Sequence, residues 1–285
     1  MFPIILKIGP FTLHTFGVML AIGVIVGSIH LGRETKRLGD PQITEARIQR
    51  LMWYVVLAVV LGGRAMHVIV NWSEYRTQLQ RIPAIWEGGL VMYGGLLAIF
   101  FTVVGFAIKN KIRILRLCDL VAPSCFLGDS IGRWGCFFAG DDYGRPTDSW
   151  VGVTFTHPES LVPAHLRGVP LHPTQIYMSL KALIIFGALM WITRHKKFDG
   201  QVAGWSFILY ACIRSVIELF RGDLDRGFIG PLSTAQFTSI FFFATGLAIL
   251  MLAPRRLLAD DLAAASPVPD AAVAAGKTRR KRARR

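Results

Sequence analysis

Three arginines interrupt apolar stretches of this sequence: Arg64, Arg133 and Arg214. A charged side chain at membrane depth is costly to bury, so such a residue is usually functional. A guanidinium group can bind phosphate oxygens through two parallel hydrogen bonds. Because the three arginines fall in the same half of their stretches, we expect them to form a site for an anionic headgroup. Arg133 also precedes a glycine-rich, acidic segment, residues 140–147, that would border this site.

One face of the stretch around Arg214 collects polar residues. Tyr210, Arg214, Glu218 and Arg221 recur at intervals of three and four residues, which places them on one side of a helix. Arg214 and Glu218 could simply neutralise each other and stabilise the fold, and Arg64 could extend to the membrane interface. We expect instead that Glu218 alone cannot neutralise the three arginines. A phosphodiester would then complete the charge balance.

Further polar side chains are expected at the same depth. His14, Tyr93, Gln175 and Tyr177 fall near the corresponding ends of their own stretches. His14 could alternatively be a hydrogen-bonded histidine of the fold, and Tyr93 an aromatic residue of the membrane interface. Glycines on both sides of Tyr93 permit a turn or a broken helix there. Lys181 receives no role from the sequence.

The composition is that of a membrane protein. Hydrophobic residues make up 53% of the 285 and charged residues 18%, with a mean hydropathy of +0.46. About 20 apolar residues cross a hydrocarbon core of about 30 Å. Stretches of roughly that length occur at residues 12–32, 50–71, 89–108, 117–139, 173–192, 200–220 and 232–253. The sequence therefore predicts an all-α, polytopic membrane protein with about seven transmembrane helices.

The positive charge of the chain, +14 in total, follows this predicted topology. Of the 32 Lys and Arg residues, 21 lie within residues 33–50, 109–116, 194–197 and 254–285, on one side of the predicted spans, and seven lie on the other side. Basic residues favour the cytoplasmic side. We therefore expect a multi-pass protein of the bacterial inner membrane with a periplasmic N-terminus and a cytoplasmic C-terminus. No nucleic-acid partner is needed to explain the charge.

We predict one transmembrane domain, residues 1–258. The connection 140–172 contains four prolines and several acidic residues, and is expected to form a small periplasmic cap. Residues 259–285 begin rich in alanine and proline and end in a basic run, which predicts a disordered cytoplasmic tail near anionic membrane lipids. No His/Cys/Asp group has metal-ligand spacing, so neither a metal nor a cofactor is expected.

Several segments together resemble the prolipoprotein diacylglyceryl transferase family. Their order and spacing carry the resemblance, which covers most of residues 8–253. The segments are Ile8–His14 followed by Phe16–Met19, Leu61–Arg64, Gly94–Leu97, Gly132–Gly135, Gly140–Thr147, His172–Tyr177 and Tyr210–Arg221.

The resemblance implies that Arg133 and Arg214 bind phosphatidylglycerol and act in catalysis, with Tyr210, Glu218 and Gly144 in support. It also implies the reaction. The thiolate of the lipobox cysteine in a prolipoprotein signal peptide attacks the glyceryl carbon that bears the phosphate, glycerol 1-phosphate leaves, and a thioether forms. We expect the arginines to stabilise the leaving phosphate and to favour the thiolate over the thiol.

Four positions depart from the usual pattern of this family. Tyr93 replaces a histidine that is the favoured general base, while Phe16, Cys136 and Asp141 replace tyrosine, asparagine and glutamate. Tyr93 or Asp141 is the expected proton acceptor, although a phenol with a pKa near 10 is a poor base at neutral pH. We therefore expect electrostatic stabilisation to matter more than any single base.

Other functions stay open at this point. A divergent paralogue with another acceptor would carry the same arginines. A seven-span transporter of anions or lipids would need paired broken helices or an internal repeat, and neither is evident in the sequence. An intramembrane hydrolase would need a Gly-x-Ser-x-Gly segment or two facing aspartates within the spans, and neither is visible.

Overall fold

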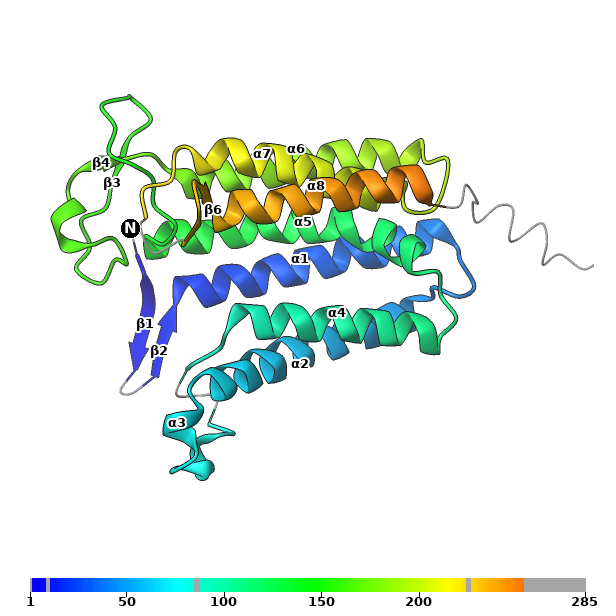
Figure 1. Ribbon diagram of the computed structural model, residues 1–285, viewed down its shortest axis with the longest axis horizontal. Coiled ribbons are helices and arrows are strands. Elements are labelled where there is room, and N and C mark those ends of the chain that lie inside the picture. The colour runs from blue at the N-terminus through cyan, green and yellow to red at the C-terminus, as the bar shows by residue number, and fades with distance from the viewer. Residues whose placement is uncertain (1, 9–10, 85–87, 224–226, 254–285) are drawn as a thin grey trace, which may run out of the picture.

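Seven long helices dominate the computed structural model, which describes residues 2–8, 11–84, 88–223 and 227–253. The helices are α1 (Thr15–Leu38), α2 (Glu45–Val70), α4 (Met92–Lys109), α5 (Ile114–Ala139), α6 (Thr174–Arg194), α7 (Gln201–Glu218) and α8 (Thr234–Leu252). They run side by side along the long axis of the molecule (Figure 1). Each of the seven predicted apolar stretches overlaps one of them along most of its length.

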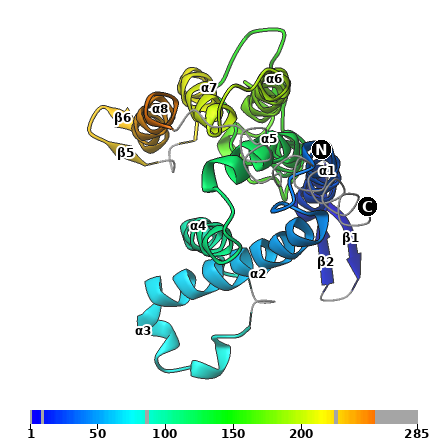
Figure 2. The ribbon, with the colours of Figure 1, turned by 90° about the vertical axis from the view of Figure 1, so that its right-hand side faces the viewer.

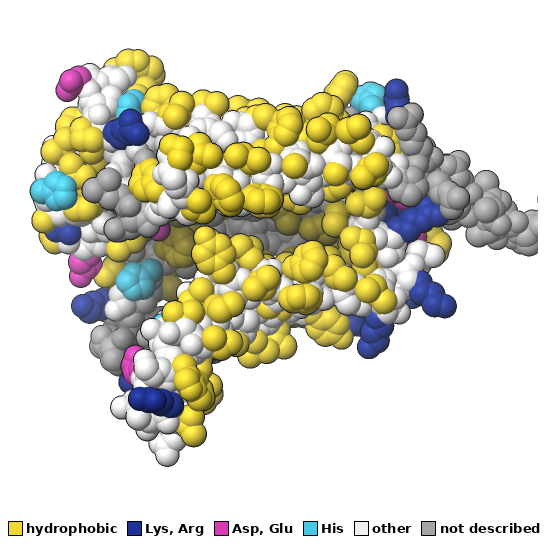
Figure 3. All heavy atoms as spheres, viewed as in Figure 1, with side chains coloured by type: hydrophobic (Ala, Val, Ile, Leu, Met, Phe, Trp, Pro, Cys, Tyr) yellow, Lys and Arg dark blue, Asp and Glu magenta, His cyan; other side chains and the backbone are white. Residues whose placement is uncertain are grey.

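Five of these helices, α1, α2, α4, α6 and α8, are long and apolar enough to cross a membrane. Together they make the chain a multi-pass membrane protein. Helices α5 and α7 are comparably long but carry more polar residues, among them Asp129, Arg133, Arg214 and Glu218. On the face seen in Figure 3, hydrophobic side chains cover the middle of the molecule, whereas Lys and Arg gather at its two ends.

Short elements gather at one end of the bundle, which we call the hairpin end (Figure 1). They include three two-stranded antiparallel sheets that the all-α prediction did not contain. The strands are β1 (Ile4–Ile8) with β2 (Phe11–His14), β3 (Val153–Thr154) with β4 (Pro170–Leu171), and β5 (Phe228–Ile229) with β6 (Leu232–Ser233). The short helices are α3 (Trp72–Tyr75), η1 (Leu79–Arg81) and η3 (Ala164–Leu166).

Glycines bring α1 and α5 into close contact. A Cβ atom at Gly23 would lie 2.6 Å from the carbonyl oxygen of Gly128, and one at Gly27 would lie 2.9 Å from that of Ser124. Both distances are below van der Waals contact, so only glycine fits at this crossing. Small residues four positions apart on a helix, here Gly23 and Gly27, allow two backbones to approach this closely. Figure 2 shows α5 to α8 along one side of the molecule and the α2–α4 pair along the other.

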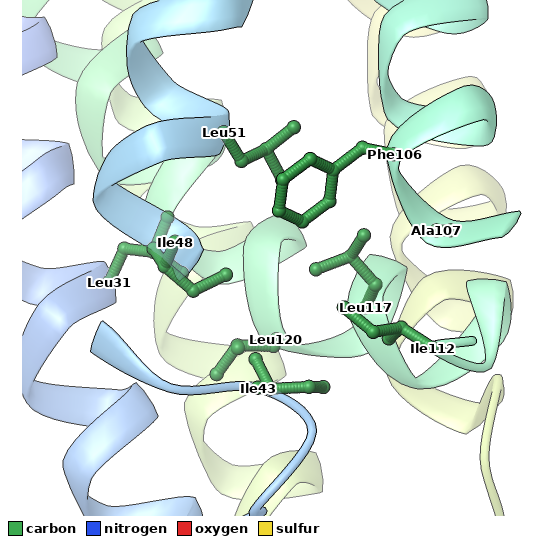
Figure 4. Close-up of a cluster of buried hydrophobic side chains, with 9 residues drawn as sticks. All are labelled: Leu31, Ile43, Ile48, Leu51, Phe106, Ala107, Ile112, Leu117 and Leu120. Atoms are coloured by element: carbon green, nitrogen blue, oxygen red, sulfur yellow. The ribbon is translucent and has the colours of Figure 1, made fainter. Parts of the chain in front are cut away.

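The opposite end of the bundle holds the main apolar core. Leu31, Leu51, Phe106, Leu117 and Leu120 bring together α1, α2, α4 and α5, and Ile43, Ile48, Ala107 and Ile112 complete the cluster (Figure 4). Burying apolar side chains from four helices in one cluster stabilises their mutual arrangement. This packing fixes the helix ends far from the polar residues that the sequence singled out.

The predicted connection 140–172 folds on a small core of its own. Phe155, Val162 and Leu171 are almost completely buried and pack with Phe137 from the end of α5. The expected tail, residues 259–285, lies outside the described residues.

Candidate phosphate-binding site

A partly buried arginine with two carboxylate partners lies in the C-terminal half of α5. Arg133 donates from Nε to Asp129 Oδ1 at 3.1 Å, one helical turn earlier, and from Nη1 to Asp142 Oδ2 at 2.8 Å. Asp142 follows the helix at a positive φ of 55°, just after Gly140 ends α5 in the left-handed region. This turn folds the acidic segment back over the helix, so that its carboxylate reaches the arginine. These two bonds use Nε and Nη1 of Arg133, and neither uses its other terminal nitrogen, Nη2.

Lys181, on α6, contacts residues of both α5 and α7. Its Nζ lies 3.8 Å from Asp129 Oδ2 and 4.4 Å from the centre of the Tyr210 ring. Tyr210 stands one turn before Arg214, whose Nη1 donates to Glu218, and both Arg214 and Glu218 are buried. Lys181 lies within electrostatic reach of Arg133 and Arg214 alike. The two arginines therefore border one polar cluster, although they come from different helices.

Arg221 extends the cluster toward the loops. It donates from Nη2 to Asp142 Oδ1 at 2.6 Å, and it bonds Asp223 through both Nε and Nη2. Burial alone would lower the pKa of Arg221, but the hydrogen bonds to Asp223 and the charge of Asp142 outweigh it and raise the pKa above the ordinary value. Arg221 is therefore always charged, and Asp142 bridges it to Arg133.

Gly144 allows three segments to meet beside these charges. A Cβ atom there would lie 2.3 Å from the carbonyl oxygen of His172 and 2.9 Å from that of Phe220. The Gly144 N–H donates to His172, and the residue forms a β-bridge with Arg221. Any side chain would push these segments apart, so the glycine positions Asp142 and Arg221.

The first turn of α6 holds the acidic segment in place. Gln175 is completely buried and donates from Nε2 to the carbonyl oxygen of Asp141 at 2.6 Å, while the Thr174 hydroxyl donates to that of Asp142. The Tyr177 hydroxyl lies 3.1 Å from His172 Nδ1, and its ring packs against Phe220. These contacts give Gln175 and Tyr177 a supporting position around the charged cluster.

Asp141 has an environment suited to accepting a proton. Burial, followed by the neighbouring charge of Asp142, raises the pKa of its carboxyl above the usual value. A carboxylate whose pKa is raised binds a proton more readily near neutral pH, which is what a general base needs.

The remaining predicted residues lie apart from this cluster. Arg64 donates to the carbonyl oxygens of Arg81, Ile82 and Gly88, at 2.6, 2.9 and 2.6 Å, in the connection between α2 and α4. Tyr93, in the first turn of α4, is 64% exposed. His14 lies at the end of β2 and is exposed. The structure thus brings Arg133 together with Arg214 and leaves Arg64 as a support of its own loop.

The sequence-based argument missed carboxylates. It counted Glu218 as the main acidic partner, whereas Asp129, Asp142 and Asp223 also pair with the arginines. The expectation of unneutralised arginines is wrong in this respect, because carboxylates on α5 and in the loops that follow α5 and α7 supply the missing charges. Two signals of this cluster were available in the sequence. Asp129 precedes Arg133 by four residues, the spacing of a helical ion pair, and Lys181 is isolated in an apolar stretch.

This arrangement defines a membrane-embedded helix bundle with a cluster of arginines, a lysine and carboxylates near one end. Guanidinium groups with unused N–H donors, held by carboxylates rather than free to move, are suited to binding a phosphate group. Such groups also stabilise negative charge as it develops in a reaction.

Comparison with known proteins identifies the family. Residues 3–252 match the family model described as prolipoprotein diacylglyceryl transferase, and the chain belongs to this family. A phosphatidylglycerol–prolipoprotein diacylglyceryl transferase from Finegoldia magna is 32% identical over 247 residues, 86% of this chain and 93% of the relative. Relatives of the same name from Nitrosomonas europaea and Bordetella avium are 34% and 31% identical, over 89% of this chain and 90% and 95% of their own lengths.

Proposed function

We propose that this protein transfers the diacylglyceryl group of phosphatidylglycerol to the cysteine thiol of a prolipoprotein lipobox. The observation that carries the proposal is the polar cluster in which Asp129 and Lys181 link Arg133 on α5 to Tyr210 and Arg214 on α7. The names of the curated relatives support the two substrates. Both substrates are amphiphiles, which fits a site within a helix bundle that lipid can reach from the side.

In the proposed reaction the cysteine sulfur attacks the glyceryl carbon next to the phosphate. The S–C bond forms while the C–O bond breaks, and the electron pair of that bond leaves with glycerol 1-phosphate. Arg133 and Arg214 stabilise the charge that grows on the leaving phosphate, because their donors are fixed before the substrate arrives. Their positive charges also favour the thiolate.

The thiol proton goes to Asp141 in this scheme. Asp141 directly precedes Asp142, a member of the charged cluster, and its pKa is raised, whereas Tyr93 lies on α4, apart from the cluster. The proton finally neutralises the released phosphate. As in the sequence-based argument, we expect the arginines to contribute more to the rate than the base.

The reaction is tested with purified protein, a lipobox peptide, and phosphatidylglycerol labelled in the glyceryl carbons of its diacylglyceryl group. The expected result is a labelled peptide whose lipid resists mild alkaline hydrolysis at the sulfur, together with one released glycerol phosphate per transfer. A peptide with serine in place of the lipobox cysteine serves as the control. Lipid movement across vesicles without any thioether product would instead support a transporter, and transfer to a different acceptor would support a divergent paralogue.

We propose a membrane arrangement with seven spans, the two polar helices α5 and α7 included. The protein lies in the inner membrane of a bacterium. Its hairpin end faces the periplasm and is capped by residues 140–172, and its C-terminus lies in the cytoplasm. The distribution of Lys and Arg supports this orientation. Single cysteines at Ser149 and Lys197, in a variant without native cysteines, should react with a membrane-impermeant maleimide from opposite sides of the membrane.

A further inference from the structure

Lys181 is a buried cation of the cluster that has no part in the reaction as described. It lies in the second turn of α6 with a side chain that is 0% exposed. Its ammonium group has no hydrogen-bond partner among the described residues. Asp129 Oδ2, at 3.8 Å, is beyond hydrogen-bond distance, and the Tyr210 ring offers only its π face.

A buried ammonium group without an acceptor is unfavourable, because it has lost water and gained nothing of equal strength. A cation–π contact returns only part of that loss. The position thus suits a ligand that brings an oxygen acceptor, rather than a permanent structural ion pair.

Lys181 is placed beside both arginines. Asp129, which pairs with Arg133, lies 3.8 Å from its Nζ, and the Tyr210 ring that the ammonium group faces lies one turn before Arg214. A ligand that offers this ammonium group an anionic oxygen, such as a phosphodiester, would also meet the arginine donors.

We propose that Lys181 is a headgroup-binding residue: its ammonium group donates to a phosphate oxygen of phosphatidylglycerol, between the two arginines. This inference rests on the proposed function, since it assigns a further residue to the same site. In the free protein, Asp129 keeps the ammonium near Arg133. When the lipid binds, Lys181 gains a charge-assisted hydrogen bond.

The test compares Lys181→Met with Lys109→Met. Both remove one positive charge, but Lys109 is exposed at the C-terminal end of α4, away from the cluster. We expect Lys181→Met to raise the KM for phosphatidylglycerol about tenfold to a hundredfold, with the KM for the lipobox peptide unchanged. Lys109→Met should change neither constant.

A second measurement separates binding from structure. Thermal unfolding in detergent is recorded with and without phosphatidylglycerol, and with phosphatidylcholine as a zwitterionic reference. Lys181→Met should keep or raise the Tm of the lipid-free protein, and should lose most of the Tm increase that phosphatidylglycerol gives the wild type. A lower Tm without lipid combined with an unchanged lipid-induced increase would assign Lys181 to the fold and overturn the proposal. Unchanged KM and unchanged Tm increase would overturn it as well.

These outcomes are distinct from a failure of the proposed reaction. If the wild type transfers the lipid and Lys181→Met behaves like the wild type, only the assignment of Lys181 falls. If the wild type is stabilised by phosphatidylglycerol but forms no thioether, the reaction falls, and the Tm measurement still decides the binding role.

Discussion

Helix α5 carries a buried charged cluster near each end, and the two clusters are built differently. At the opposite end, Arg116 donates to Asp199 at 2.8 Å and to Asp40 at 3.0 Å, and all three residues are at most 4% exposed. Lys196 lies 2.9 Å from Asp119 and 2.8 Å from Asp199. Asp119 also accepts the backbone N–H groups of Gly200 and Ala203. This cluster ties two interhelical connections, α1–α2 and α6–α7, to α5.

The cluster at the hairpin end is less complete. The side chains of Asp129 and Arg133 are 32% and 23% exposed, and the Lys181 ammonium group has no hydrogen-bond partner among the described residues. The difference separates two uses of buried charge. A saturated network holds a fold and has nothing left for a ligand, whereas a network with unused donors is stable enough to persist and still able to bind.

The largest effect on stability is expected at the saturated network. Arg116→Met leaves Asp40 and Asp199 buried without their main partner, and breaking a buried ion pair in this way costs about 3–5 kcal/mol. We expect a correspondingly lower free energy of unfolding, measured with denaturant in detergent. Arg194→Met, at an exposed position, removes the same charge and should change little. Equal stability of the two variants would mean that the network does not hold the fold.

Arg133→Ala should show the reverse pattern. Removing one fixed donor from a developing oxyanion lowers the rate about 100-fold to 1000-fold, so we expect transfer to fall by that much. Asp142 keeps Arg221 as a partner and Asp129 is partly exposed, so the loss of stability should be smaller than for Arg116→Met. Transfer is measured on folded protein purified by size-exclusion chromatography. If Arg133→Ala instead destabilised the fold and kept its activity while folded, the contrast between the two clusters would not hold.

Strong acid should weaken the saturated network. Burial would raise the pKa of Asp199, but hydrogen bonds from Arg116 and Lys196 outweigh burial and lower it. A carboxyl group with a lowered pKa contributes stability above its unfolded pKa of about 3.9, and this contribution disappears as the pH falls through the folded pKa. We expect wild-type stability to drop below about pH 4. Asp199→Asn should be less stable at neutral pH and should show a shallower drop, in unfolding curves recorded against pH.

The smallest effect is expected at Tyr93. Its exposed ring makes no described contact with Arg133 or Arg214, and exposed substitutions usually change free energies by less than about 0.5 kcal/mol. Tyr93→Phe should therefore reduce transfer by less than about threefold. A complete loss of transfer with normal folding would make the phenol the essential proton acceptor and would displace Asp141 from that role.

The helices were easier to predict than the hydrogen-bond and ion-pair partners of the charged side chains. A long helix overlaps every predicted apolar stretch, because the apolar length needed to cross a membrane is encoded locally in the sequence. The hairpins escaped prediction, since strands of two to five residues are too short to show a clear pattern. The role of Arg64 escaped too: its acceptors are backbone carbonyls up to 24 residues away, and backbone oxygens carry no sequence signature.

The sequence by itself determined the membrane class, the family and the presence of arginines at one depth, because hydropathy, charge bias and motif order are properties of the linear chain. Only the tertiary structure decided which charges meet. Asp142 reaches Arg221 across 79 residues, and Lys181 reaches Asp129 from another helix. Such pairings depend on how helices pack at glycine contacts and where loops fold back, and these distances are set by the whole bundle rather than by any local stretch.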